Sequence, residues 1–320
     1  MKTKAILVQL VTVFGFTVSA AYAGGPTRPC LIKVTNGESI QSAVTEASQD
    51  GCTIWVGEGI YDEDIFIDAA AANLKNLTLI GAGIGKTVIR GHVNVLDRNE
   101  ERGFGIPPSG RSITTIKHLT LDGNGIAPQS GLINDSAYVR LESVRITKFS
   151  VFGVLISAFS RVDMDHCVID HNTFGLADNS VGGTWIQLLN NTFADNAFAI
   201  VLNVQHQFDS YANIINNIIA GSQTGIYVEN SFFTPFVEFN DFFGNQVDID
   251  SGGAVQGDQS TNLDADPMFR SPATGDYHIR YNSPCINAGD PLSPRDPNGS
   301  IADIGALPFA GISPVMLKAD

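Results

Sequence analysis

Short runs of alternating apolar and polar residues recur about every two dozen positions through the middle of the chain. Four segments end in closely similar ways: VDMDHCVIDHN at 162–172, IQLLNNTFADN at 186–196, ANIINNIIAGS at 212–222 and VEFNDFFGN at 237–245. If Val144, Cys167, Asn191, Asn217 and Asn240 hold one equivalent position, the steps between them are 23, 24, 26 and 23 residues. This period predicts stacked coils that share one core, because a single coil cannot bury its own apolar side.

The strand that follows each polar turn reads VFGVLIS, TFGLADNS, FAIVLNV and TGIYVEN. Alternation along these strands predicts which side chains enter the core and which face solvent. The inward columns are Val154, Leu176, Ile200 and Ile226, followed by Ile156, Asp178, Leu202 and Val228. The outward columns are Leu155, Ala177, Val201 and Tyr227, followed by Ser157, Asn179, Asn203 and Glu229. Asp178 is the only charged residue expected to point inward.

No stretch with helical periodicity of ten residues interrupts the strands after Cys52, which removes a doubly wound α/β fold. We therefore predict an all-β solenoid of parallel coils, about eight to ten in number, over residues 51–260. Residues 24–50 are expected to supply a first strand and an amphipathic helix at 39–47 that covers the open end of the stack. Residues 261–320 lack the period and are expected to form a second, irregular cap folded back along the stack.

Residues 1–23 have the features of a secretory signal, with Lys2 and Lys4 ahead of an apolar run that ends in small residues. A membrane anchor is the alternative, but the run contains Gln9 and Thr12 and is shorter than the ~20 apolar residues that a span needs. We predict cleavage at the end of this segment. The product is then secreted, periplasmic or extracellular, without a membrane span.

The chain is acidic, and removal of residues 1–23 leaves 17 basic against 33 acidic residues. A field of this sign repels polyanions, so nucleic acids and anionic membrane surfaces are expected to be poor partners. Acidic polysaccharides are disfavoured too, unless a cation or a local basic patch intervenes. Capped ends favour a monomer.

Cysteines 30 and 52 each precede a similar four-residue strand, LIKV and TIWV. If these strands are neighbours in a parallel sheet, the two Cα atoms lie ~5 Å apart, within reach of a disulfide. Cys167 shares the repeat position of Val144 and is expected to be a buried core residue rather than a nucleophile.

With these residues in view, the chain resembles the right-handed parallel β-helix proteins of the pectin lyase-like superfamily. The resemblance rests on SIQSAVTEASQDGCTIWVGEGIYDEDIFI, on LTLIGAGIGKTVIRG, on the NNTFADN and NNIIAGS coils, and on the tail from DPMF to DIGALPF. It covers nearly all of residues 30–309 and implies the fold. It does not select an activity, because the superfamily holds lyases, hydrolases, epimerases and adhesins.

Several polar groups have two interpretations. Asn191, Asn217 and Asn240 could bind sugars, but their repeat position favours an internal ladder that satisfies buried turns. The segment Asp163–His171 could bind a metal, but its spacing matches no zinc or EF-hand pattern, which favours a solvated turn.

No cofactor is specified by a motif. Calcium is kept as the alternative to solvated surface acids at Asp62, Glu63, Asp64 and Asp68, and at Asp264 and Asp266.

The outward face of the VFGVLIS-type strands is the candidate site, with Asn179 and Asn203 as substrate-binding residues. Tyr227, Glu229 and His206 are the candidate proton acceptors. Long connections, including residues 97–111, 203–210 and 229–236, follow this strand type and are expected to rim the face. Arg98, Arg102 and Arg111 are assigned to substrate binding from there, and an ordinary polar loop is the alternative.

These features predict an exported protein that binds or modifies polysaccharide. Lyase or epimerase chemistry fits better than hydrolysis, because the outward columns offer only Glu229 and, several coils away, Asp135 as acids. The competing class is a noncatalytic adhesin or structural solenoid.

Overall fold

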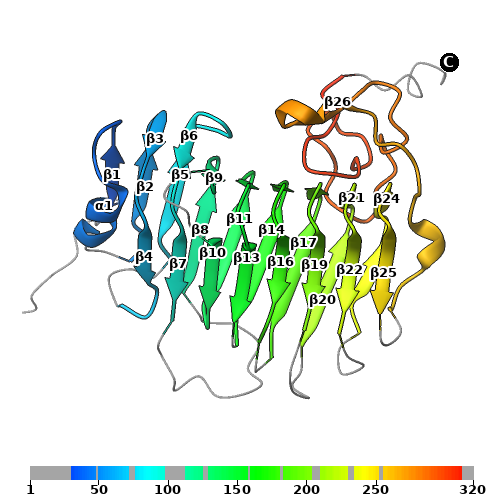
Figure 1. The fold of residues 1–320 in the computed structure, drawn as a ribbon. Helices are drawn as coiled ribbons and strands as arrows, with labels where there is room; N and C mark the ends of the chain where they lie inside the picture. The colour runs from blue at the N-terminus through cyan, green and yellow to red at the C-terminus, as the bar shows by residue number, and fades with distance from the viewer. Residues whose placement is uncertain are drawn as a thin grey trace, which may run out of the picture.

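Three parallel sheets run the length of a solenoid of about eight coils (Figure 1). The structure, a computed structural model, describes residues 30–47, 50–71, 76–97, 112–124, 129–157, 159–180, 183–203, 210–229, 234–251 and 255–311. Each full coil contributes one strand to sheet A, one to sheet B and one to sheet C, in that order. The predicted all-β fold with parallel coils is confirmed.

Sheet A contains β1 Leu31–Val34, β2 Thr53–Val56, β5 Thr78–Gly81, β8 Ile113–Lys117, β11 Tyr138–Glu142, β14 Arg161–Asp165, β17 Trp185–Leu189, β20 Tyr211–Ile215 and β23 Phe236–Glu238. Sheet B contains β3 Gly59–Tyr61, β6 Thr87–Ile89, β9 Thr120–Asp122, β12 Arg145–Thr147, β15 Val168–Asp170, β18 Thr192–Ala194, β21 Ile218–Ala220 and β24 Asp241–Phe243. Sheet C contains β4 Ile65–Asp68, β7 Val93–Leu96, β10 Ser130–Asp135, β13 Phe152–Ser157, β16 Phe174–Asp178, β19 Phe198–Leu202, β22 Thr224–Val228 and β25 Val247–Ser251.

The register places equivalent residues of successive coils in columns. Val154, Leu176, Ile200 and Ile226 are paired in sequence along sheet C, and all four are fully buried. The alternation in the sequence therefore predicted the lining of the core correctly. One continuous apolar interior stabilises the stack, because each coil buries its lining against its neighbours.

The turn between sheets A and B is held by an asparagine ladder. The main-chain N–H groups of Cys167, Asn191 and Asn217 each donate 2.9 Å hydrogen bonds to the side-chain oxygen of the asparagine one coil further on. Asn240 continues the ladder, donating through its own N–H to Asn262 Oδ1 at 2.8 Å. The internal role predicted for these asparagines is confirmed, and Asn262 extends it into the tail.

A second ladder, which the sequence analysis did not predict, stabilises the turn between sheets B and C. Asn172 Oδ1 accepts from Phe149 N, and Asn196 Oδ1 accepts from Asn172 N at 2.9 Å. Both asparagine side chains are buried, so these bonds satisfy main-chain groups that water cannot reach.

The first coil is closed by helix α1, Ile40–Glu46, with Ser39 as its N-cap. Ile40, Ala43 and Val44 are buried, so the helix covers the end of the core as predicted. Cys30 and Cys52 form a disulfide with Cα atoms 4.6 Å apart, which joins the first two strands of sheet A.

The segment after β25 folds back over sheet B (Figure 1). It contains the 3₁₀ helices η2 Gln259–Thr261 and η3 Pro272–Thr274 and the antiparallel pair β26 Phe269–Ser271 and β27 Asp276–Ile279. Asn190 Nδ2 donates to Asp303 O, and Ala306 N donates to Thr192 Oγ1. In the described part of the chain, no helix is long and apolar enough to cross a membrane.

Candidate functional site

A groove of about 470 Å³ crosses the outer face of sheet C over β13, β16, β19 and β22. Its lining consists of Phe152, Phe174, Ala177, Asp178, Asn179, Phe198, Val201, Asn203, Tyr227 and Glu229. The volume lies within the range of natural ligand sites. Strands from four successive coils thus build a single elongated surface along the solenoid.

An aromatic ladder forms one side of the groove. The rings of Phe152, Phe174 and Phe198 stack with centroids 5.3 Å apart, and Tyr227 meets Phe198 edge to face at 6.3 Å. Gly175 follows Phe174, and a Cβ there would lie only 2.5 Å from the carbonyl oxygen of the next coil. Glycine is therefore required beside the Phe174 ring, because a side chain there would collide with the backbone of the next coil.

Polar side chains form the opposite side of the groove, one per coil. Asn179, Asn203 and Glu229 each follow the last residue of their sheet C strand, and their N–H groups donate to the preceding coil. Asn179 and Glu229 are exposed, and Asn203 is half-buried. Two amides and one carboxylate can therefore reach a ligand that lies along the ladder.

Asp178 borders the groove, but its side chain points into the core. Its side chain is fully buried in the inward column, where Thr184 Oγ1 donates to it at 2.6 Å and Ser180 N at 3.1 Å. Burial raises the pKa of this carboxyl to about 6, against the opposing effect of these hydrogen bonds. Asp178 thus ties the end of β16 to the start of β17 and does not present its carboxyl to a ligand.

The groove offers a single exposed acid among its lining residues, Glu229. Asp135 occupies the same outward column at the end of β10, four coils from Glu229, or ~19 Å away at the strand spacing. Paired carboxyl groups in glycoside hydrolases stand no more than ~9.5 Å apart. These two acids cannot form such a pair.

The structure brings together four of the eight predicted site residues. Asn179, Asn203, Tyr227 and Glu229 all line the groove, although their roles stay predictions. The other predicted positions, His206, Arg98, Arg102 and Arg111, lie outside the described residues.

The phenylalanine ladder was missed by sequence reasoning. A signal existed, because an aromatic residue followed by a small one occupies the same place in three coils, at 152–153, 174–175 and 198–199.

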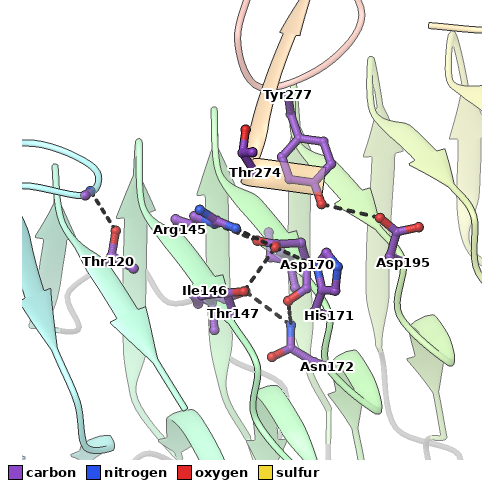
Figure 2. A network of polar contacts seen from close by, with 12 residues as sticks. Thr120, Arg145, Ile146, Thr147, Asp170, His171, Asn172, Asp195, Thr274 and Tyr277 are labelled. Carbon is purple, nitrogen blue, oxygen red and sulfur yellow. Dashed lines mark hydrogen bonds and ion pairs between the residues drawn. The ribbon is translucent and has the colours of Figure 1, made fainter. Parts of the chain in front are cut away.

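A second polar cluster lies on sheet B beneath the folded-back tail (Figure 2). Arg145 donates to both oxygens of Asp170, at 2.8 and 2.7 Å. Thr147 Oγ1 donates to Asp170 as well, and His171 Nδ1 lies 2.9 Å from it. Asp170 is fully buried, so the prediction of a solvated turn was wrong here: the ion pair with Arg145 compensates the desolvation of the carboxylate.

This cluster holds the tail in place. Gly275, in the left-handed region with φ 80°, lies directly over the Arg145 guanidinium, where a Cβ would come within 2.6 Å. Tyr277 is buried nearby and its hydroxyl donates to Asp195 at 3.5 Å (Figure 2). Since four donors already engage Asp170, the cluster fits an anchoring role better than a catalytic one.

The acids near the first coils are engaged by local contacts. Glu63 accepts hydrogen bonds from the first turn of α1, and Asp62 forms a bidentate pair with Arg90. Asp64 and Asp68 each accept from a main-chain N–H group.

At the other candidate calcium position, Asp266 Oδ1 accepts from Met268 N at 2.8 Å. Among the described residues, no three metal-binding side chains gather into a site. Main-chain N–H groups therefore already engage carboxylate oxygens in both acidic groups.

Residues 64–213 match the family model described as a right handed beta helix region. Together with the three parallel sheets, this match identifies the fold as a right-handed parallel β-helix. No curated protein matches this β-helix chain in sequence.

Similar solved structures include ORF18 of Geobacillus virus E2, at 13% identity and TM-score 0.34, over 70% of this chain and 59% of that one. Two A-modules of Azotobacter vinelandii mannuronan C-5 epimerases also match. AlgE6 has 15% identity and TM-score 0.28 over 71% of this chain and 94% of its own; AlgE4 has 14% and 0.23 over 68% and 95%. The β-helix protein thus spans less than two thirds of the viral chain, and likenesses of this size carry no argument about activity.

Proposed function

We propose that this β-helix protein is exported and binds a polysaccharide chain along the groove of sheet C. The observation that carries the proposal is the aromatic ladder, aligned with Asn179, Asn203 and Glu229 across four coils. Aromatic faces pack against the apolar C–H faces of sugar rings, while amides and carboxylates pair with hydroxyl groups. An elongated surface with one such set per coil suits a polymer better than a compact metabolite.

Export is supported by two features. The segment 1–23, outside the described residues, has the composition of a secretory signal. The Cys30–Cys52 disulfide suits an oxidising compartment.

The pair of Tyr227 and Glu229 favours proton abstraction as a second candidate function. The two residues are two positions apart at the end of β22, and both line the groove. Lyases and epimerases remove a proton next to a carboxyl group with one base, whereas hydrolases need two carboxyl groups. A single exposed acid beside a phenol therefore fits β-elimination or epimerisation better than hydrolysis.

The test is a screen of the purified protein on neutral and acidic polysaccharides, with and without calcium. Binding is followed by affinity electrophoresis, and turnover by the absorbance of unsaturated products and by reducing ends. Phe174→Ala should weaken binding about tenfold through loss of one ring of the ladder. Phe66→Ala, an exposed phenylalanine of the same sheet outside the groove, is the matched control and should bind as the wild type does.

The outcomes separate the functional classes. Turnover that Glu229→Gln abolishes while binding persists would establish the enzymatic function. Retention of glycans without any turnover would favour the noncatalytic class. If no polysaccharide is retained or altered, the proposal fails.

A further inference from the structure

The outer face of sheet A carries an uncharged patch in the same coils as the groove. We name it the aromatic–amide patch; it consists of Trp185, Gln187, Leu189, Tyr211, Asn213 and Ile215. The register pairs Trp185 with Tyr211, Gln187 with Asn213 and Leu189 with Ile215. Each outward position of β17 thus meets a chemically similar position on β20.

The patch contrasts with the coil that precedes it. On β14, Arg161 forms a bidentate pair with Asp163, which also accepts a 2.6 Å hydrogen bond from Tyr138 on β11. These side chains satisfy one another. By contrast, β17 and β20 have no charged residue. Asn213 Nδ2 donates to Gln187 Oε1 over a long distance, 3.5 Å, and the described part of the chain gives these two side chains no closer polar partner.

Two aromatic rings dominate the patch. Tyr211 is 47% exposed, and its ring centroid lies 6.0 Å from that of half-buried Trp185 at an interplanar angle of 46°. Amide groups stand next to the rings in the neighbouring column. Rings with adjacent uncharged donors and acceptors match a hydroxyl-rich neutral ligand, whereas a charged ligand would find no counter-charge within the patch.

The strands of the groove lead directly into the strands of the patch, since β17 follows β16 and a sheet A strand, β20, follows β19 along the chain. Thr184, which immediately precedes Trp185, donates to Asp178 of the groove strand β16 at 2.6 Å. Asn203 at the end of β19 precedes Tyr211 by eight positions in the next coil. The groove and the patch therefore lie on the two sheet faces that flank the same edge of the solenoid.

From this continuity we infer that the aromatic–amide patch is a second subsite for the same ligand, and that the ligand is a neutral polysaccharide long enough to bend around this edge. The inference rests on the binding function proposed above and not on proton abstraction, which needs a carboxyl group that a neutral chain lacks. It adds that binding strength depends on chain length: a short oligosaccharide occupies the groove alone, and a polymer occupies both surfaces.

The experiment compares variants by affinity electrophoresis in gels containing galactomannan, xyloglucan, mixed-linkage β-glucan or dextran. With the polymer that retards the wild type, Trp185→Ala should weaken binding by at least ~5-fold, and Trp185→Phe should restore most of it. Trp55→Ala is the matched control, because Trp55 is 39% exposed on the same face, at β2 near the other end of sheet A. A trisaccharide cut from that polymer should bind wild type and Trp185→Ala equally.

Four results would decide whether the aromatic–amide patch is a second subsite. Weakening by Trp185→Ala for the polymer only supports the second subsite. Unchanged polymer binding by Trp185→Ala, with binding still lost in Phe174→Ala, overturns the subsite and leaves the proposed function standing. If none of the four neutral polymers retards the protein, the inference fails, and the wider screen on acidic polymers decides the proposed function separately. If light scattering shows a wild-type dimer that Trp185→Ala dissociates, a second copy of the chain covers the patch and the inference is overturned.

Discussion

Asp178 shows how one residue can interrupt an apolar column without breaking the stack. Its neighbours in the column, Ile156 and Leu202, are fully buried aliphatic residues. Its carboxyl is also buried, and it accepts hydrogen bonds from the segment that leads into β17. The buried carboxyl of Asp178 thus links sheet C to the segment that enters sheet A, and its burial raises its pKa.

Replacement of this carboxyl should change how stability depends on pH. The pKa is raised from 3.8 to about 6 in the folded protein, so the folded state binds the proton more tightly than the unfolded chain. The contribution to stability is therefore complete below about pH 4 and is lost as the pH rises through 6. Asp178→Asn removes this titration. The unfolding free energy of the variant minus that of the wild type should therefore increase by about 2–3 kcal/mol from pH 4 to pH 7.5.

Urea unfolding at the two pH values measures this change. Other titrating groups cancel in the difference, because both proteins contain them. A difference between wild type and Asp178→Asn that stays constant with pH would contradict the assignment.

At the scale of elements, the two ends of sheet C are protected in different ways. At β4, Phe66 N donates to Gln41 Oε1 at 2.6 Å and Gln41 Nε2 donates to Phe66 O, so a side-chain amide from α1 takes the place of a neighbouring strand. At the other end no described strand pairs with the outer edge of β25, where Val247 is 45% exposed. Asp248 and Asp250 lie on that edge strand, and charges of this kind oppose edge-to-edge pairing.

Removal of the two charges should expose a surface for self-association. The double variant Asp248→Val, Asp250→Val makes β25 continuously apolar and extended, so we expect oligomers at micromolar concentration. Light scattering after size exclusion measures the mass. The variant Asp248→Lys, Asp250→Lys should remain monodisperse, because lysine protects edges equally well; equal behaviour of the two variants would refute the role of the charges.

At the scale of the whole molecule, the coils form a linear array in which each contacts its neighbours, so damage at one end should stay local. The Cys30–Cys52 disulfide spans 22 positions at the first coil. Replacing both cysteines with serine should cost about 3 kcal/mol in the chain-entropy account. Hydrogen exchange should accelerate in β1, α1 and β2 and stay unchanged in β17 and β20. Uniform acceleration along the array would argue for a single cooperative unit instead.

The repeat along the chain also decides which structural features the sequence could predict. Columns such as Val154 to Ile226 were predictable, because a period near 24 and strand alternation together specify which positions face inward. The asparagine ladder was predictable for the same reason. The burial of Asp170 was not, because it depends on Arg145 one coil earlier and on a tail about a hundred residues later. The phenylalanine ladder needed only a comparison of equivalent positions. The arginines predicted to bind substrate, Arg98, Arg102 and Arg111, lie outside the described residues.

The asparagine ladder makes each coil depend on the coil that follows it in the chain. Every rung is satisfied by the coil that comes next in the chain, and the last buried donor, Asn240 N, is satisfied only by Asn262 of the tail. Each coil therefore gains its ladder hydrogen bond only when the next coil has folded, and the coil of Asn240 gains it only when Asn262 is in place. In a chain that stops before residue 262, the N–H group of Asn240 would have to pair with water instead of with the tail.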